Sequence, residues 1–416
     1  MSKSLTMYSG LIAVYTILGM ILLWPTQTSL VKEGRDIRQD YLGGRRFMQK
    51  FDLYTPFSQA ELISIHVEPD LGMDRNFHPP TTLVFFIPLT LLNFQWAVLV
   101  WGVISLLLFF TSMYLILNDL GYRKWFFYTP CLLLWFPLWL HMRFGQFSIL
   151  ILFFLVLVWI NLRRNKTNFA GLFLALACLV KIFPLVIVIL LVIKRQWKTL
   201  VWFSFSVTLS ISVIYLYYHH SMSKFVIEIA PQNSTIFRNY FGNFSLNGFV
   251  GRLFNGTSHI SPLFSENNLE SFIYYSGLGL FILIAITFSR NVKDFDLCFA
   301  TFIVVMLIVS PTTWAHSFVI LLLPACILLA SMRKSNNRLG SLLFIVVALL
   351  SSIPHWHYYT WLMTIAPTRL LPSWLLFTSP GFYVLVGLLT LCIWQGFRSR
   401  QPRQFSVQYV PSLDKK

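Results

Sequence analysis

The sequence predicts an all-α membrane protein that crosses the bilayer many times. Of its 416 residues, 56% are hydrophobic and only 11% are charged, whereas soluble domains have about 25% charged residues. Apolar runs recur from Leu11 to Trp394, many of them near the ~20 residues that a helix needs to cross a bilayer. Basic residues gather in the short connectors, as the positive-inside rule predicts for cytoplasmic loops. We expect one integral-membrane domain over residues 1–397 and a cytoplasmic tail over 398–416.

The order of the apolar runs predicts about 11–13 transmembrane helices, with boundaries uncertain by about 2–4 residues. The first is expected at residues 7–25, retained because no small-residue cleavage site follows it. It leads to an outer loop at 26–80. Pro88 and Asn93 divide the next run, 81–118, into a short re-entrant piece and a full helix. The remaining crossings are expected at 125–141, 147–162, 168–180, 183–194, 199–218, 271–289, 295–310, 317–332, 339–353 and 375–394.

Most of the acidic residues fall in two large loops that face outward in this topology. The first loop, 26–80, holds Glu33, Asp36, Asp40, Asp52, Glu61, Glu68, Asp70 and Asp74, and the second, 219–270, holds Glu228, Glu266 and Glu270. A smaller outward loop, 354–374, is rich in aromatic residues, which suit a membrane interface. An enzyme of this topology that needs a carboxylate would therefore have it on the extracytoplasmic face.

Several functional classes lack their signatures. The sequence has no P-loop, GxSxG, HExxH or GxGxxG motif, which argues against ATP-driven pumps, serine hydrolases, zinc proteases and nucleotide-dependent redox enzymes. The five cysteines all lie in apolar runs without metal-binding spacing. The net charge of +17 resides in connectors, so it indicates contact with membrane lipids and no nucleic acid. No organic cofactor is required, and the clustered aspartates alone do not indicate a divalent metal.

The first loop carries the densest group of charges. Residues 36–51 have helical spacing, and their apolar side chains can form a stripe on the membrane surface. Asp36 and Asp40 are four residues apart and share a face of that helix. Gly43–Gly44 would let another backbone or a substrate approach closely. Periodicity alone favours a solvated interfacial helix whose charges pair with each other.

The stretch "DIRQDYLGGRRFMQKFDLY" resembles the first-loop signature of glycosyltransferase family 87. Asp36, Tyr41, Gly43–Gly44 and Tyr54 stand at the expected spacing, while Phe51 stands where the family often has glycine. The resemblance continues through "FHPPTTLVFFIPL" (77–89), "RFGQFSILI" (143–151), "AGLFLALACLVKIFPLVIVILLVIKRQWK" (170–198), "NYFGNFSLNGFVGRLF" (239–254) and "SPTTWAHSFVILLLP" (310–324). In the first of these segments, His78 stands where the family usually has tyrosine.

The resemblance implies a GT-C-like bundle in the plasma membrane, with short interfacial helices in the first loop. It also implies transfer of a hexose, typically mannose, from a polyprenyl-phosphate donor to an extracytoplasmic lipid or glycan acceptor. Such a donor leaves as a phosphate anion, so the protein needs one base and cations but no second carboxyl acid. We expect inversion by single displacement with Asp36 as the base, and a lesser role for Asp40. His316 either supports the base, binds a sugar hydroxyl or packs in the interior.

Lys181 is the main candidate for binding the phosphate. It lies between two apolar runs that are too short to cross unaided, which is typical of broken helices. A lysine within the membrane costs roughly 2.5–3.5 kcal/mol on insertion scales and is a functional candidate by default, although its ammonium can also extend to an interface. Further candidate binding residues are Arg143, Gln146, Tyr41, His78, Asn243, Ser245 and Arg252.

A flippase for lipid-linked sugars, or another multi-pass transporter, is the alternative function. Many helices and broken segments around Lys181 suit it. Transporters place their critical ionisable groups near the membrane midplane, whereas the acidic residues here lie in an outer loop. That difference favours the glycosyltransferase.

Overall fold

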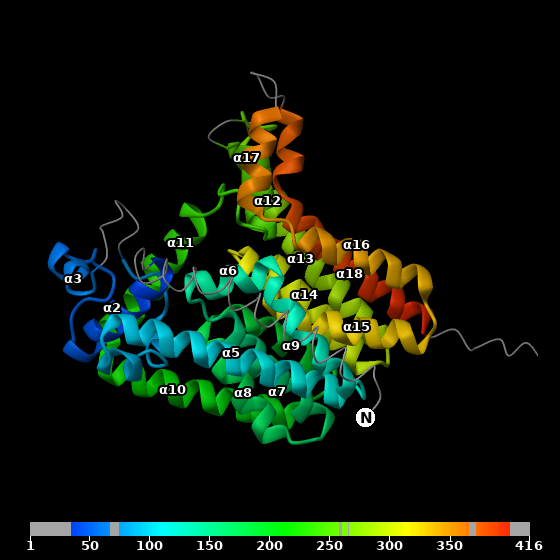
Figure 1. Cartoon of the computed structure of the whole chain (residues 1–416), viewed down its shortest axis with the longest axis horizontal. Helices are drawn as coiled ribbons and strands as arrows, with labels where there is room; N and C mark the ends of the chain where they lie inside the picture. Colours follow the sequence, from blue (N-terminus) through cyan, green and yellow to red (C-terminus); the bar gives the residue numbers. More distant parts are fainter. Residues whose placement is uncertain (1–34, 67–74, 258–259, 265, 366–371, 400–416) are drawn as a thin grey trace, which may run out of the picture.

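The computed structural model describes residues 35–66, 75–257, 260–264, 266–365 and 372–399, and within these ranges the regular structure is helical throughout. The expected first crossing at 7–25 and almost all of the expected tail lie outside them. Figure 1 shows the helices as an elongated assembly, with α2 (Arg35–Gln49) and α3 (Gln59–Ser64) at one end. A tower at the top contains α12 (Leu246–Asn255) and α17 (His355–Ile365).

One group of helices forms the lower part of the assembly (Figure 1). It consists of α5 (Phe94–Asp119), α7 (Ser148–Arg163), α8 (Thr167–Val180) and α10 (Trp197–Lys224). Helix α7 packs against both α5 and α8, and α8 packs in turn against α10. The buried face of α7 includes Leu152, Leu155 and Trp159. Burial of such apolar side chains against neighbouring helices holds this layer together.

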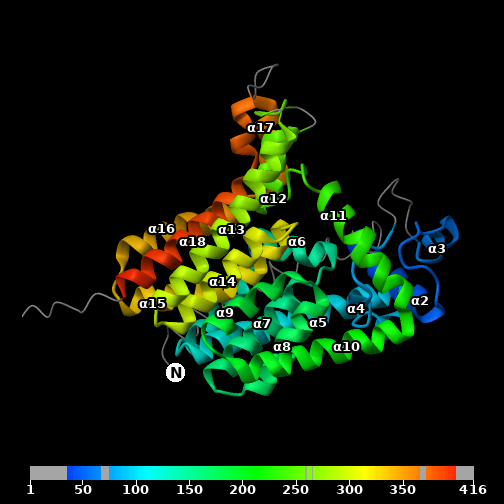
Figure 2. The ribbon, with the colours of Figure 1, turned by 180° about the vertical axis from the view of Figure 1, so that it is seen from behind.

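The second group surrounds helix α14 (Phe295–Val309), which packs against the other long helices of the group. These are α13 (Asn267–Asn291), α15 (Leu322–Lys334) and α18 (Pro380–Arg398), with α16 (Arg338–Ser351) outside α15 and α18. Figure 2 shows the same layer from behind. Every side chain of α14 from Leu297 to Ile308 is buried. A helix that is apolar all round belongs in the interior, so α14 is the core of this group.

The protein is an all-α membrane protein with several spans. Within the described residues, five helices are long and apolar enough to cross a bilayer: Phe94–Asp119, Trp197–Ile236, Asn268–Asn291, Ala315–Lys334 and Pro380–Arg398. A sixth span results if the bent pair α6 (Phe136–Phe144) and α7 is counted as one. The other expected crossings correspond mostly to shorter apolar helices of 10–17 residues, including α8, α14 and α16. The long helices alone thus give fewer crossings than the expected 11–13.

The crossing expected at 125–141 is not one continuous α-helix. This stretch begins as a 3₁₀ helix, η2 (Arg123–Leu134), which contains Pro130 and ends at an extended residue, Trp135. The next helix, α6, starts there and lies at 116° to α7. Proline lacks the N–H that an α-helix needs in its interior and clashes with the preceding turn, so the apolar run is broken although its length suggested a span.

The turn between α6 and α7 depends on Gly145. Its φ of +65° is left-handed, a conformation that costs glycine little. A Cβ at this position would lie 2.9 Å from the Cβ of Ile37 on α2. The glycine therefore allows both the reversal of the chain and the close approach of α2, with Gln146 directly after the turn.

The expected division of residues 81–118 into a short first piece and a full helix is confirmed. Its segments α4 (Pro80–Leu83) and η1 (Ile87–Leu91) precede the long helix, and the Asn93 side chain caps that helix by accepting from the N–H of Trp96. Short segments also follow the break at Lys181, namely η3 (Phe183–Val186) and α9 (Ile187–Ile193).

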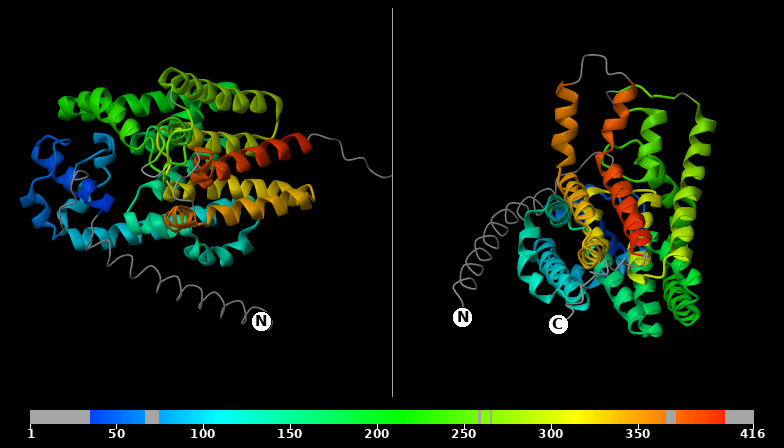
Figure 3. Two further views of the ribbon diagram at one scale, coloured as in Figure 1. Left: turned by 90° about the horizontal axis from the view of Figure 1, so that it is seen from above. Right: turned by 90° about the vertical axis from the view of Figure 1, so that its right-hand side faces the viewer.

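The two segments expected as outward loops after residue 218 contain more helix than the sequence predicts. Helix α10 does not end at residue 218 but bends there, because Tyr218 has a non-helical φ of −145°. It continues through a π-helix, η4 (Phe225–Ile229), into α11 (Ala230–Ile236). The aromatic 354–374 segment likewise forms α17, followed by η6 (Pro372–Thr378). In the right-hand view of Figure 3, α17 (orange) rises beyond the bundle.

Arg46 fastens the first loop. Its guanidinium donates to both carboxylate oxygens of Glu61 at 2.7 Å, to the Thr55 carbonyl at 2.6 Å and to the Pro56 carbonyl at 3.0 Å. It also lies over the ring of Phe57. The two glycines on α2 are used for packing in the same way: a Cβ at position 43 or 44 would meet Asn76 or Thr90 within 3 Å.

Replacing Arg46 by methionine should loosen this loop. We expect a loss on the order of 2–3 kcal/mol, less than the 3–5 kcal/mol of a fully buried pair because the Glu61 side chain is 29% exposed. Hydrogen exchange of the 52–64 amides should accelerate, whereas Arg45→Met should have little effect.

Burial alone would raise the pKa of Glu61, but hydrogen bonds from Arg46 and Ser58 lower it to about 2. The pair therefore stabilises the loop above pH ~4.5 and loses this contribution only as the pH falls through about 2. Equal exchange in the two variants at pH 7 would contradict this role.

Candidate active site

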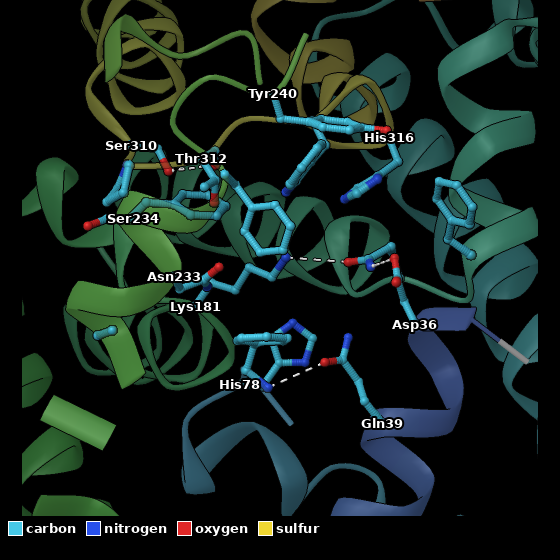
Figure 4. A pocket seen from close by; sticks show the side chains of 18 of the residues that line it. Asp36, Gln39, His78, Lys181, Asn233, Ser234, Tyr240, Ser310, Thr312 and His316 are labelled. Carbon is cyan, nitrogen blue, oxygen red and sulfur yellow. Dashed lines mark hydrogen bonds between the residues drawn. The ribbon is translucent and has the colours of Figure 1, made fainter. Parts of the chain in front are cut away.

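A cavity of about 650 Å³ opens where α2, the 77–79 segment, the α6–α7 turn, the residues after α8, α11 and η5 (Ala315–Leu321) converge. Figure 4 shows side chains from these distant segments pointing into it. Its polar part is lined by Asp36, Arg38, Gln39, His78, Gln146, Lys181 and His316. Another part of the wall is aromatic and contains Phe77, Phe237, Tyr240 and Trp314. A polar end beside an aromatic wall is typical of sites for small polar ligands.

Asp36 and Lys181 are joined through Gln146. The amide nitrogen of Gln146 donates to Asp36 Oδ2 at 2.6 Å, and its oxygen accepts from Lys181 Nζ at 3.4 Å (Figure 4). One amide thus holds the carboxylate and the ammonium apart on the same wall. This arrangement leaves a carboxylate and an ammonium group facing one cavity without a direct ion pair between them.

The break in the helix at Lys181 is held by two threonines of α4. Lys181 has extended backbone angles, so helix α8 ends at Val180. The hydroxyls of Thr81 and Thr82 donate to the carbonyls of Leu179 and Val180 at 2.6 and 2.7 Å. Carbonyls at a helix end have no partner within the helix, so these two bonds stabilise the end of α8 and fix the position from which Lys181 projects.

Asp40 lies behind the cavity and holds His78. The carboxylate is buried, and its Oδ1 lies 2.6 Å from His78 Nδ1. The backbone of His78 is fixed as well. The Asn76 side chain accepts from the His78 N–H at 2.8 Å, and the Tyr54 hydroxyl donates to the His78 carbonyl at 3.1 Å. The ring packs edge-on against Phe147. Asp36 and Asp40 therefore have different partners although they share one face of α2.

The Asp36 carboxyl is in an environment that favours its protonation. Burial raises its pKa above the ordinary value, and the nearby Asp40 charge acts in the same direction. The hydrogen bond from Gln146 and the charges of His78 and Lys181 oppose the shift without cancelling it. A raised pKa brings a carboxylate closer to the range in which it accepts protons effectively near neutral pH.

His316 also faces the cavity. Its side chain is buried, and neither ring nitrogen has a hydrogen-bond partner within the described part of the chain. The ring meets Phe144 edge-on at 6.2 Å. Buried polar groups normally have partners, so a pair of unpartnered nitrogens on a cavity wall is consistent with a bound polar ligand as well as with a packing role.

Two predicted binding residues lie away from the cavity lining. The hydroxyl of Tyr41 donates to the Leu92 carbonyl at 2.7 Å and so fastens α2 to the segment before α5. The guanidinium of Arg143 lies over the ring of Trp139, 5.3 Å from its centroid. The structure does not bring either side chain together with Asp36 and Lys181.

Three further predicted residues form a buried network behind the 310–313 segment. Asn243 donates to the Pro311 carbonyl and accepts from Ser245 Oγ at 2.8 Å. Arg252 is fully buried and donates to the carbonyls of Tyr240 and Asn243 and to Ser379 Oγ. These bonds shape the backbone beside the cavity, and the three side chains themselves do not line it.

Several lining residues were missed at the sequence level. Arg38 and Gln39 lie in the charged stretch of α2, where spacing alone does not separate them from their neighbours. Asn233 and Ser234 lie on α11, in a segment that the sequence suggested to be loop. Trp314 was within a quoted motif, but nothing in the pattern indicated that it would line the cavity.

The described residues contain no group of three or more histidine, cysteine or carboxylate side chains placed to bind a metal ion. The aspartates on α2 are instead occupied by Gln146 and His78. The chemistry available in this cavity is that of a carboxylate, cations and imidazoles.

A family model for glycosyltransferase family 87 matches residues 76–311, more than half of the chain. The chain belongs to this family. Neither the curated proteins nor the solved structures contain a significant match. The matched range contains His78, Gln146 and Lys181, while Asp36 and His316 lie outside it. Family membership makes the protein a glycosyltransferase, which transfers a sugar from a donor to an acceptor.

Proposed function

We propose that this protein transfers a hexose, most readily mannose, from a polyprenyl-phosphate donor to a lipid or glycan acceptor on the extracytoplasmic face of the plasma membrane. The observation that carries the proposal is the shared wall of Asp36, Gln146 and Lys181 in a cavity of about 650 Å³. Apolar side chains, among them Leu140, Phe144 and Ile182, line part of this cavity, and we expect a lipid-bound donor to enter it from the bilayer. The expected fold type is GT-C.

The reaction needs one proton acceptor and one cationic site. The acceptor hydroxyl attacks the anomeric carbon, and its proton passes to Asp36. The bond between that carbon and the phosphate oxygen breaks, and polyprenyl phosphate leaves with the bonding electrons. Lys181 stabilises the negative charge on the phosphate. Because the departing phosphate oxygen is stable as an anion, no second carboxyl is needed as an acid, and a single displacement inverts the anomeric configuration.

The purified protein should transfer label from radiolabelled polyprenyl-phosphate mannose to a component of a membrane lipid extract. A sugar nucleotide offered in its place should give no product. Transfer from the nucleotide alone would contradict the proposed donor class. Movement of the intact donor across a vesicle membrane, without cleavage, would favour the transporter function instead.

The proposed topology places Asp36 and His316 outside and the Arg163 and Arg333 connectors in the cytoplasm. The connectors around Arg163 support this, because Arg163 and Arg164 pair with Asp119 beside a second, charged cleft that also contains Lys194. Clusters of this kind are typical of cytoplasmic edges.

Single cysteines can test this topology in a variant whose five native cysteines are replaced. A cysteine at position 36 should react with an impermeant thiol reagent in intact cells, and one at position 163 only after permeabilisation. A cysteine at exposed Glu228 is the control for reagent access to the same side. Labelling at positions 36 and 228 only after permeabilisation would contradict the proposed orientation.

A further inference from the structure

The pair formed by Asp40 and His78 has no part in the reaction described above. Asp40 is 1% exposed, and its carboxylate lies 2.6 Å from His78 Nδ1. The His78 side chain is 12% exposed and lines the cavity. No partner within the described residues occupies its other ring nitrogen, Nε2. An imidazole anchored through one nitrogen presents the other in a fixed direction, which is a feature of ligand-binding histidines.

The charged groups around His78 come from several elements. Asp36 and Asp40 approach from α2, and Lys181 from the end of α8, while His316 of η5 is also within electrostatic range. Arg38 of α2 lines the same cavity. With both carboxylates ionised, the charges of Arg38 and Lys181 cancel those of Asp36 and Asp40. A proton on His78 leaves one net positive charge, which equals the single negative charge of a sugar phosphodiester.

We infer that His78, held by Asp40, is a second ligand for the phosphate of the lipid donor. Protonated on both nitrogens, it donates from Nδ1 to Asp40 and from Nε2 to a phosphate oxygen, while Lys181 binds the phosphate from the other side. Both side chains line the cavity, and Figure 4 shows the Lys181 side chain and His78 near each other in it. The inference rests on the proposed donor class, and it assigns Asp40 to positioning and charging the imidazole.

The buried carboxylate gives the physical reason for this assignment. A buried charge is costly unless it is paired, and the buried Asp40 carboxylate has the His78 imidazole as its partner, 2.6 Å from Nδ1. Charge-assisted hydrogen bonds to phosphate are roughly twice as strong as neutral ones. A proton acceptor is already supplied by Asp36, so the remaining requirement of the site is for positive charge.

Binding of two lipids by the full-length protein in lipid nanodiscs separates the headgroup from the chain. The probes are a polyprenyl monophosphate and the polyprenol of the same length. We expect the wild type to prefer the phosphate, and His78→Phe to reduce that preference about 10–100-fold while its affinity for polyprenol is unchanged. His78→Gln keeps a hydrogen-bond donor without the charge, so it should lose less of the preference for phosphate. Asp40→Asn should also lower this preference. His357→Phe, a change at an exposed histidine, is the control.

The outcomes distinguish this inference from the proposed function. An unchanged preference for phosphate in both His78 variants would overturn it. Lost turnover with unchanged phosphate binding would make His78 a proton acceptor and overturn it as well. If the wild type binds both lipids equally, the proposal of a polyprenyl-phosphate donor is wrong, and this inference, which rests on it, is wrong as well.

Discussion

Asp36→Asn should fold, insert and bind the donor lipid, yet lose about 10²–10⁴ in turnover, the range for removal of a general base. Asparagine is nearly isosteric and can still accept the hydrogen bond that Gln146 donates to Asp36 at 2.6 Å. It cannot take up the proton of the acceptor hydroxyl. The measurement is kcat at saturating donor, with donor affinity measured separately, so that loss of chemistry is distinguished from loss of binding.

The best matched control is Glu228→Gln, which makes the same chemical change at an exposed position on η4. Asp40→Asn, one helical turn from Asp36, was expected from the sequence to cost much less. The structure gives it a partner on the cavity wall, His78, so we now expect a moderate loss that appears in donor affinity. A similar kcat in Asp36→Asn and the wild type would remove Asp36 as the base.

The pH dependence of the wild type provides a second measure of the same residue. Asp36 must be ionised to accept a proton, and burial raises its pKa above the ordinary 3.8. Turnover should therefore fall as the pH decreases through this raised pKa, so the acid limb should lie at a higher pH than an ordinary aspartate gives. An acid limb at the ordinary value would show that Asp36 does not control the step.

Lys181→Met should weaken donor binding about 10–100-fold, as expected for the loss of a hydrogen bond to a charged group. Methionine keeps most of the apolar stem and removes the ammonium. The change should harm folding little, because among the described residues the ammonium makes one long hydrogen bond, 3.4 Å to Gln146, while the break at residue 181 is held by Thr81 and Thr82.

Lys194→Met is the matched control for this prediction. The Lys194 ammonium donates to the carbonyls of Ser289 and Val292 at 2.8 and 3.0 Å, in the charged cleft away from Asp36. Its loss should lower stability and leave the donor affinity of the folded protein unchanged. If Lys181→Met instead folds normally and binds donor as the wild type does, Lys181 is structural and Arg38 becomes the leading phosphate ligand.

The sequence predicted the principal groups of the site but not how they are connected. Asp36, Gln146 and Lys181 were each identified by a motif or by an intramembrane charge, and the structure brings all three to one cavity. The Gln146 amide can join Asp36 and Lys181 because the turn at Gly145 places α2 beside the start of α7. Such a contact between residues 110 positions apart is not encoded in local spacing.

Motifs also predicted residues whose partners turned out to lie within the protein. Arg252 and Asn243 were candidates for substrate binding, but their polar atoms bond to the Tyr240 and Pro311 carbonyls. A motif gives the residue type and not its partner, so structural and binding roles look alike in sequence. The same limit applies to helix length. The apolar run that contains Pro130 is long enough to span a bilayer, but its 3₁₀ helix ends at the extended residue Trp135.

The most direct measurement is a structure of the Asp36→Asn variant with polyprenyl-phosphate mannose bound, since this variant should hold the donor without consuming it. We expect the phosphate within hydrogen-bonding distance of Lys181 Nζ, and the anomeric carbon facing the side chain at position 36. The lipid chain should leave the cavity between the surrounding apolar helices. A donor bound elsewhere, with the cavity beside Gln146 open, would contradict the proposed site and mechanism.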